Sequence, residues 1–463
     1  MTLASTITFS AAPERRCLRG ILVAVLAAGC TVAHPQPDPG GAIARSLEFA
    51  DAVAFRSEGG PIDARAGPAD ALSVASALRR GVETSPELQA ALARVRAAQA
   101  DAELAALLPN PILSIVLRFP EGGGSPDVEA GLAADLLAIL QRPRRASAAG
   151  NRLEAEVANA LSTALDVVAG IEQRYSEVQA LEALVVVLEQ RLTVLDRLRE
   201  VAQARLDFGQ GTRHDVTALD AERMLLGVEL DLRRRELRVA RFALSRAIGE
   251  PSGSATWTLD PWSPFEPIPA TEQAWIDAAL EHRPELLAIE WELRAREDEE
   301  ALAGGRALDG ASAGVEAERD GEWSLGPSIS TPLPLFDTGQ ARRERARALT
   351  SEQRHRLTQA RRGVVEDVRS ALETFVGAQE SLERIVDDLI PLQERRRAEI
   401  AEAFQLGLVD ATALLFADQA LQQSQARRID VSRAVTSAHI RLQRSVGGPS
   451  VLRSVLTWTP QQP

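Results

Sequence analysis

The chain has 463 residues, of which 45% are hydrophobic and 25% are charged, a balance that excludes collagen-like, low-complexity and fully disordered proteins. Its 52 basic and 65 acidic residues give a net charge of -13, and all the basic residues are arginines because the sequence contains no lysine. An acidic chain of this kind argues against a nucleic acid as partner. Two cysteines are too few for a disulfide framework or a four-cysteine zinc site.

Residues 1–29 have the features of a bacterial lipoprotein signal peptide. Three arginines within residues 15–19 precede an apolar run that ends at Gly29. The run is too short to cross a bilayer as a helix, which takes about 20 residues, but it suits the apolar part of a secretion signal. The residues before Cys30 resemble a lipobox, with Ala27 where leucine is commoner. We therefore predict that Cys30 is the lipid attachment site; a simple cleaved signal or a buried cysteine is the alternative.

Residues 30–70 are rich in proline, glycine, alanine and aspartate and show little periodicity. This composition predicts a lipid-anchored linker between the modified cysteine and the folded part. No later segment is a long uninterrupted apolar stretch. If the protein crosses a membrane, it must therefore cross it as β-strands.

The rest of the chain is predicted to form two structural repeats, residues 71–249 and 271–448. A proline-rich connector at 250–270 joins them, and a C-terminal tail covers 449–463. Three short matches recur in the same order at offsets of 198, 196 and 195 residues: Ser85–Leu88 with Arg283–Leu286, Phe208–Gly211 with Phe404–Gly407, and Asp215–Leu219 with Asp410–Leu414. Together they are much stronger evidence for a duplication than any one of them alone.

Each repeat has the same predicted order of elements: a helical stretch, two strands, a long helix, and a further helix after a glycine turn. Apolar residues at heptad spacing mark the long helices, for example Leu181, Val185 and Leu188. A helix of about 66 residues would be roughly 100 Å long, which excludes a compact globule. The heptads alone fit a plain coiled coil equally well, and it is the strands that argue against that alternative.

Four strand segments alternate between apolar and polar residues. The first runs from Ile112 to Phe119, the second covers 129–136, the third covers 315–318 and the fourth covers 323–333. An apolar face on segments of about this length is typical of transmembrane β-strands. Four strands leave two open edges, and the smallest closed barrels use about eight strands. We therefore predict a homo-oligomer, with dimer, trimer and tetramer all open.

The low aromatic content does not favour a membrane barrel. Aromatic residues make up only 4% of the chain, with a single tyrosine, whereas membrane barrels usually carry aromatic girdles. Soluble hairpins that cap a coiled coil are therefore the alternative.

The five histidines are isolated from one another, and without lysine the chain cannot form a phosphate-binding loop of the nucleotide-hydrolysing type. We predict no enzyme activity, no metal site and no cofactor.

The sequence resembles the TolC-like outer-membrane efflux proteins, particularly the lipid-anchored factors that export drugs or heavy metals. The resemblance covers residues 71–448 and rests on three ordered stretches: Leu108–Pro111, Gly326–Gln340 and Phe404–Gly407. It implies a mainly α fold with a small β part, in which long antiparallel helices form a periplasmic α-barrel. Four transmembrane strands per protomer would close into a 12-stranded barrel in a homotrimer. A periplasmic adaptor (membrane fusion) protein, an inner-membrane pump and outer-membrane lipid are the implied partners.

The resemblance also places a constriction at the periplasmic tips, where the long helices turn into their partners. Asp207, Asp215 and Asp410 become candidate gate residues, because three symmetry-related carboxylates would form a cation-attracting ring. Helix capping is the alternative role for Asp215 and Asp410. Gly211 and Gly407 are expected to take positive φ in the turns and to face the adaptor.

The predicted function is that of a passive outer-membrane exit duct, lipid-anchored and largely periplasmic, for small molecules or metal cations. The alternative from another class is a lipid-tethered periplasmic coiled-coil scaffold without channel activity. The sequence does not identify the exported substrate.

Overall fold

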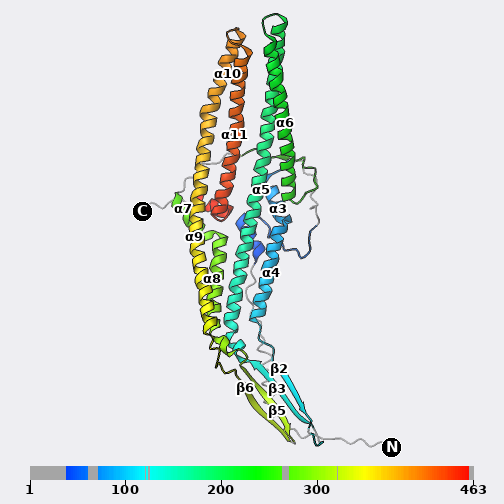
Figure 1. Ribbon diagram of the computed structural model, residues 1–463, viewed down its shortest axis with the longest axis vertical. Helices are drawn as coiled ribbons and strands as arrows, with labels where there is room; N and C mark the ends of the chain where they lie inside the picture. Colours follow the sequence, from blue (N-terminus) through cyan, green and yellow to red (C-terminus); the bar gives the residue numbers. More distant parts are fainter. Residues whose placement is uncertain are drawn as a thin grey trace, which may run out of the picture. The chain divides into compact units, whose positions relative to one another are not determined.

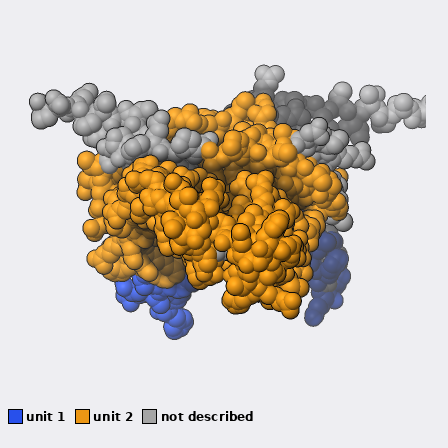
Figure 2. Space-filling view, turned by 90° about the horizontal axis from the view of Figure 1, so that it is seen from above, with its two compact units in different colours: residues 1–37, 99–151, 294–350 blue, residues 38–98, 152–293, 351–463 orange. Residues whose placement is uncertain are grey.

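A computed structural model describes residues 38–60, 71–119, 121–123, 126–262, 271–320 and 322–457 (Figure 1). The predicted signal peptide and Cys30 lie outside these residues. The described chain divides into two units (Figure 2). Unit 1 comprises residues 99–151 and 294–350, and unit 2 comprises 38–98, 152–293 and 351–457. Each unit therefore draws on both predicted repeats.

Unit 1 contains an antiparallel sheet of four strands in the order β2-β3-β5-β6. These are β2 (Ile112–Arg118), β3 (Asp127–Asp135), β5 (Ser312–Asp320) and β6 (Glu322–Ser330). The four predicted strands are thus confirmed. The third runs further at both ends than its short apolar alternation indicated, because β3 and β6 pair with it along most of its length.

The register of the sheet places most of the apolar residues of the four strands on one face. Leu113 of β2 lies opposite Leu132, which in turn lies opposite Val315. The alternate positions carry Glu129 and Glu318, which are direct cross-strand neighbours. Because side chains alternate along a strand, the sheet has one apolar and one polar face. In the described residues β2 and β6 each pair on one side only.

The helices form two long hairpins (Figure 1). In the first, α5 (Leu136–Asp207) has 72 residues and is followed by α6 (Arg213–Ala247) with 35. At 1.5 Å per residue α5 is about 108 Å long. In the second, α9 (Gln340–Glu383), the π-helix η2 (Arg384–Leu389) and α10 (Ile390–Gln405) form one continuous helical run. The returning helix is α11 (Ala411–Ser445). The prediction of paired long helices is confirmed.

The helical stretch that opens each repeat is divided in two. The first repeat has α3 (Val74–Thr84) and α4 (Pro86–Ala106), and the second has α7 (Glu272–His282) and α8 (Pro284–Ala303). Ser85 and Arg283 at the breaks have extended backbone angles. Each precedes a proline, whose ring disfavours the helical conformation of the residue before it.

Two further helices correct the predicted linker and tail. Helix α2 (Pro39–Leu47) lies within the segment expected to be a linker, and its Ile43 and Leu47 are buried in a cluster with Leu88 and Leu165. Helix α12 (Pro449–Thr457) lies within the expected tail and contributes Leu452 to another core cluster. Burial against the long helices stabilises these nine-residue helices, which would be unstable alone.

A short parallel pairing connects the start of the first repeat with the connector. Strand β1 (Ala71–Leu72) pairs with β4 (Thr258–Leu259). The only tyrosine of the chain, Tyr175 on α5, donates its hydroxyl proton to the carbonyl of Leu72 (2.8 Å) and accepts from the amide of Asp260 (2.8 Å). The 3-10 helix η1 (Gly305–Leu308) completes the regular elements. Among the described helices, none is both long and apolar enough to cross a bilayer.

Candidate functional site

The turn of the first hairpin is closed by a reciprocal capping box. Thr212 is the N-cap of α6, and its hydroxyl oxygen accepts a hydrogen bond from the amide of Asp215 (3.2 Å). The Asp215 carboxylate accepts one from the amide of Thr212 (3.0 Å). The backbone hydrogen bond from Thr212 holds the pKa of Asp215 below its usual value. Both partners of the box satisfy amides that the helix itself leaves unpaired.

The turn of the second hairpin is capped by a different residue type at the corresponding place. Asp410 is the N-cap of α11, and its carboxylate accepts from the amide of Ala413 (3.0 Å). Asp207, at the end of α5, is exposed and accepts from the side-chain amide of Gln203 (2.9 Å). Capping, the alternative to gating, is therefore the local role of Asp215 and Asp410. Their part in a gate stays a prediction, as does that of Asp207.

The glycine with positive φ in the first turn is Gly209 (73°), whereas Gly211 is absent from the positive-φ residues. The expectation of positive φ at Gly211 is therefore wrong. Gly407 has a φ of 74°, as expected. A β-carbon at Gly211 would lie 3.1 Å from the amide nitrogen of Leu206, so close packing is what favours glycine there. That either glycine faces an adaptor stays a prediction.

The two turns align at an offset of 198 residues rather than the 195 or 196 of the sequence matches. At this offset the N-cap Thr212 corresponds to the N-cap Asp410, and Gly209 corresponds to Gly407. Asp215, in the first turn of α6, is consequently not the counterpart of Asp410. The sequence match aligned these two aspartates wrongly, because aspartate is favoured both at the N-cap and in the first turn of a helix.

The same offset relates two ion pairs that the sequence matches did not reveal. Arg199 contacts Asp220 within the first hairpin, and Arg397 contacts Asp418 within the second, each at 2.5 Å. Within each hairpin the partners are 21 residues apart. A repeat search weighted toward charged residues at an offset of 198 could have found them.

Contacts near the turns connect the two hairpins of one protomer. The guanidinium carbon of Arg205 lies 4.9 Å from the centre of the Phe404 ring. Further along, the side-chain amide of Gln419 donates to Glu222 (2.9 Å). At the turns themselves Phe208, Leu406 and Leu408 are 67–83% exposed. The turns thus present apolar side chains to their surroundings.

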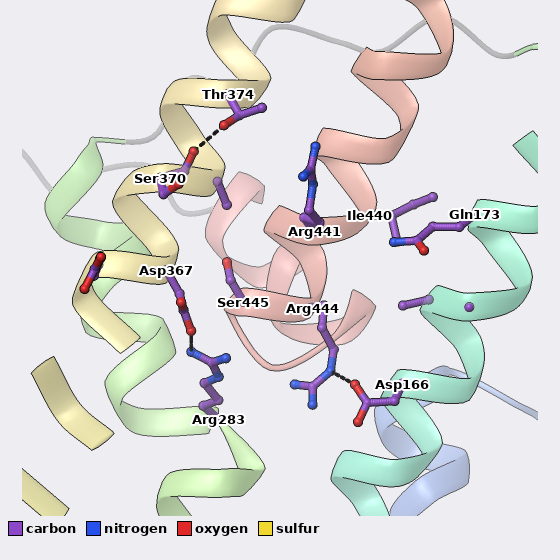
Figure 3. Close-up of a pocket in the computed structure, with 14 residues that line it drawn as sticks. Asp166, Gln173, Arg283, Asp367, Ser370, Thr374, Ile440, Arg441, Arg444 and Ser445 are labelled. Carbon is purple, nitrogen blue, oxygen red and sulfur yellow. Dashed lines mark hydrogen bonds and ion pairs between the residues drawn. The ribbon is translucent and has the colours of Figure 1, made fainter. Parts of the chain in front are cut away.

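A polar cavity of about 520 Å³ lies in unit 2 among α5, α9 and α11 (Figure 3). Arg444 contacts Asp166 (2.7 Å) and Glu285, and Arg283 contacts Asp367 (2.8 Å). Burial raises the pKa of Glu285, but the hydrogen bond and charge of Arg444 outweigh it and lower the pKa overall. Arg444 and its partner Ser162 are 282 residues apart, so sequence reasoning could not pair them.

Besides the hairpin turns, the sheet of unit 1 is a candidate functional surface. Its apolar face exposes Leu113, Ile115, Trp323, Leu325 and Ile329 to between 62% and 81% of their full accessibility. Its polar face carries four glutamates, of which Glu129 is paired with Arg118 (2.8 Å). No group of histidine, cysteine, aspartate and glutamate side chains suited to a metal ion occurs in the described ranges.

Comparison with known proteins indicates a family in which the hairpin turns and the sheet can be interpreted. Residues 275–448 match the model of the family described as "Outer membrane efflux protein". The pyoverdine export outer membrane protein OpmQ of Pseudomonas aeruginosa is 24% identical over 81% of this chain and 84% of its own length. Over residues 275–448 the chain is thus similar to the outer membrane efflux protein family.

Solved structures share the fold. The outer membrane protein VceC of Vibrio cholerae has a TM-score of 0.69 at 17% identity and covers 81% of this chain and 96% of its own. A structure of CusC, a protein that forms a transmembrane channel, has a TM-score of 0.69 at 16% identity and covers 86% of this chain and 98% of its own. The predicted resemblance is confirmed, and so is a mainly helical fold that matches those of TolC-like channels.

Proposed function

We propose that the protein is the outer-membrane channel subunit of a tripartite efflux system and acts as a passive exit duct. The observation that carries the proposal is the sheet of unit 1, which exposes an apolar face and in which β2 and β6 pair on one side only within the described part of the chain. Unpaired backbone groups are costly in hydrocarbon, so a membrane-embedded sheet of this kind requires further copies. Similarity to an outer membrane efflux family over residues 275–448, and to an export protein over most of the chain, supports the same conclusion.

A row of exposed apolar residues on α6 supports a homo-oligomer. We call these six residues the α6 stripe; they are 46–73% exposed and comprise Met224, Leu225, Val228, Leu232, Val239 and Phe242. Most are spaced at intervals that place them along one side of a helix. The corresponding positions of α11 are largely polar. A large apolar surface favours an association partner, and the homotrimer implied by the family resemblance would provide one.

The finer assignments form part of the proposal. A periplasmic adaptor would meet the exposed apolar residues of the two turns, near Gly211 and Gly407, and an inner-membrane pump would supply the energy. Acylated Cys30 would anchor residues 30–70 at the outer membrane. Small molecules or metal cations are the proposed cargo. The domain limits at 71–249, 250–270 and 271–448 complete this assignment.

One experiment separates the duct from the scaffold alternative. The full chain is purified in detergent, its mass is measured by light scattering, and its conductance is measured in planar bilayers. A trimer with reproducible conductance steps supports the duct. A monomer that remains in water after the lipid is removed, and that carries no current, supports the scaffold.

The gate is tested with three variants, Asp207→Ala, Asp215→Ala and Asp410→Ala, in the same bilayers. If carboxylate rings hold the resting channel closed or attract cations, removing one should raise the resting conductance or lower cation selectivity. Unchanged conductance in both the Asp215 and Asp410 variants would leave capping as their whole role.

A further inference from the structure

A basic cavity of about 260 Å³ lies in unit 1, between the end of α8 and the start of α9. From α8 it is lined by Arg296, Glu299 and Ala303, and from α9 by Arg342, Arg345, Ala346 and Leu349. The spacing of three, four and seven residues places each set on one side of its helix. The cavity is thus a groove between two helix faces whose polar lining is dominated by guanidinium groups.

The lining has a surplus of positive charge. Arg296 contacts Glu299 (3.0 Å), and Arg342 contacts Asp337 (2.8 Å), which lies outside the lining. Arg345 is exposed and forms no ion pair or hydrogen bond within the part of the chain that the structure describes. The first turn of α9 contains no acidic residue. Just before it, Asp337 accepts from the amide of Gly339 (2.8 Å), so the surplus charge of the lining is that of Arg345.

The chemistry of these groups favours an anion with several oxygen acceptors. A guanidinium donates in a planar fork that matches phosphate oxygens. The volume suits a single phosphate group with a small substituent. We propose that the cavity binds a phosphate mono- or diester, with Arg345 as its principal ligand and Arg342 beside it.

The position of the cavity in the chain suggests where such a phosphate would come from. Helix α8 ends nine residues before β5 begins, and α9 begins ten residues after β6 ends. If the sheet lies in the outer membrane, as the proposed function holds, lipid headgroups are close to both helix ends. A phospholipid headgroup and a free phosphate ester share the chemistry, and the experiment distinguishes them.

The test uses the purified full chain in detergent and needs no channel activity. Affinity for glycerol phosphate and inorganic phosphate is measured by titration calorimetry, and retention of phosphatidylglycerol is measured by native mass spectrometry. Arg345→Ala is expected to weaken binding at least fivefold, Arg345→Lys less, and Arg345→Glu to abolish it. Arg433→Ala, at an exposed arginine of α11 in unit 2, is the matched control and should bind normally.

The outcomes separate the two sources and the two proposals. Retention of phosphatidylglycerol with weak binding of the small esters assigns the site to a lipid headgroup, whereas tight binding of the small esters assigns it to a free phosphate. Binding that is absent from the unaltered chain, or equal in the Arg345→Glu and Arg433→Ala variants, overturns the inference. A protein that binds phosphate but carries no current would contradict the proposed duct and still support the phosphate site.

Discussion

Two glycines in the hairpin turns provide a direct test of backbone conformation. Gly209 and Gly407 have positive φ, and no other atom lies within 4 Å of a β-carbon placed on either one. Replacement by alanine should therefore destabilise through backbone strain alone, by about 1–2 kcal/mol at each turn. Gly211→Ala should also destabilise the protein, but through the close contact of the new β-carbon with Leu206 and not through backbone strain. Thermal unfolding of the three variants measures this; equal unfolding temperatures for Gly209→Ala and unaltered protein would contradict the assignment.

Glu172 on α5 predicts a dependence of stability on pH. It forms no hydrogen bond or ion pair with any residue in the described ranges, and burial raises its pKa from 4.5 to about 7. Between these values the folded chain keeps a proton that the unfolded chain has released. Stability should therefore fall as pH rises from about 4.5 to 7, by about 1–2 kcal/mol for a half-buried group.

The control for this prediction lies on the same helix. Glu172→Gln should remove the fall and raise stability at pH 8, whereas the same change at the exposed Glu177 should leave the slope unchanged. Denaturant unfolding at pH 5 and pH 8 measures both. A slope that survives in Glu172→Gln would assign the effect to other groups.

At the scale of the elements, the repeat-related ion pairs differ in burial and should differ in energy. The Asp418 side chain is 8% exposed and one of its oxygens has no hydrogen-bond partner among the described residues, whereas the Asp220 side chain is 45% exposed. Arg397→Ala leaves a buried carboxylate without its cation and should cost about 3 kcal/mol. Arg199→Ala should cost less, because the Asp220 carboxylate that it leaves without a cation stays solvated. Adding Asp418→Asn to Arg397→Ala should recover part of the loss, and denaturant unfolding would show whether it does.

Pro391 makes the second long helix different from the first. Proline lacks an amide hydrogen, and in the preceding turn the amide of Ile390 donates to the carbonyl of Ile385, the five-residue spacing of a π-helix. Pro391→Ala should slow amide exchange over residues 384–395 and stabilise the chain by about 1 kcal/mol. Thr193→Pro, at the corresponding position of the regular α5, should cost about 3 kcal/mol. Equal exchange rates before and after Pro391→Ala would show that the distortion has another cause.

The sequence was sufficient to predict elements that are marked by a regular hydrophobic pattern over many neighbouring residues. Alternation predicted strands at Ile112–Phe119 and 323–333, and heptads predicted the paired long helices. It failed for α2 and α12, because segments rich in glycine or proline become helical here only through burial on distant helices. At the turns it found Gly407 but missed Gly209, since short matches fix an alignment only to within a few residues. The polar cavity around Arg444 depends on contacts across 282 residues, which no local pattern encodes.

At the scale of the whole molecule, the α6 stripe predicts how association can be disrupted without unfolding the protomer. Val228 is 68% exposed, so an aspartate there remains solvated in a single protomer but would be desolvated in an oligomer. Val228→Asp should therefore leave helix content unchanged and shift the oligomer toward monomer, at a cost of about 2 kcal/mol or more for each interface. Sedimentation in detergent together with circular dichroism measures the two effects.

The duplication itself supplies the control. Ala426 occupies the position of α11 that corresponds to Val228, on a helix with a single large exposed apolar residue, Phe416, among those described. Ala426→Asp should leave the oligomer intact if association uses the apolar face that only α6 has kept. Dissociation by both variants would place the interface on both hairpins alike, and dissociation by neither would remove α6 from it. Because the two repeats share an order of elements but not their exposed surfaces, their divergence favours α6 as the contact surface of the proposed oligomer.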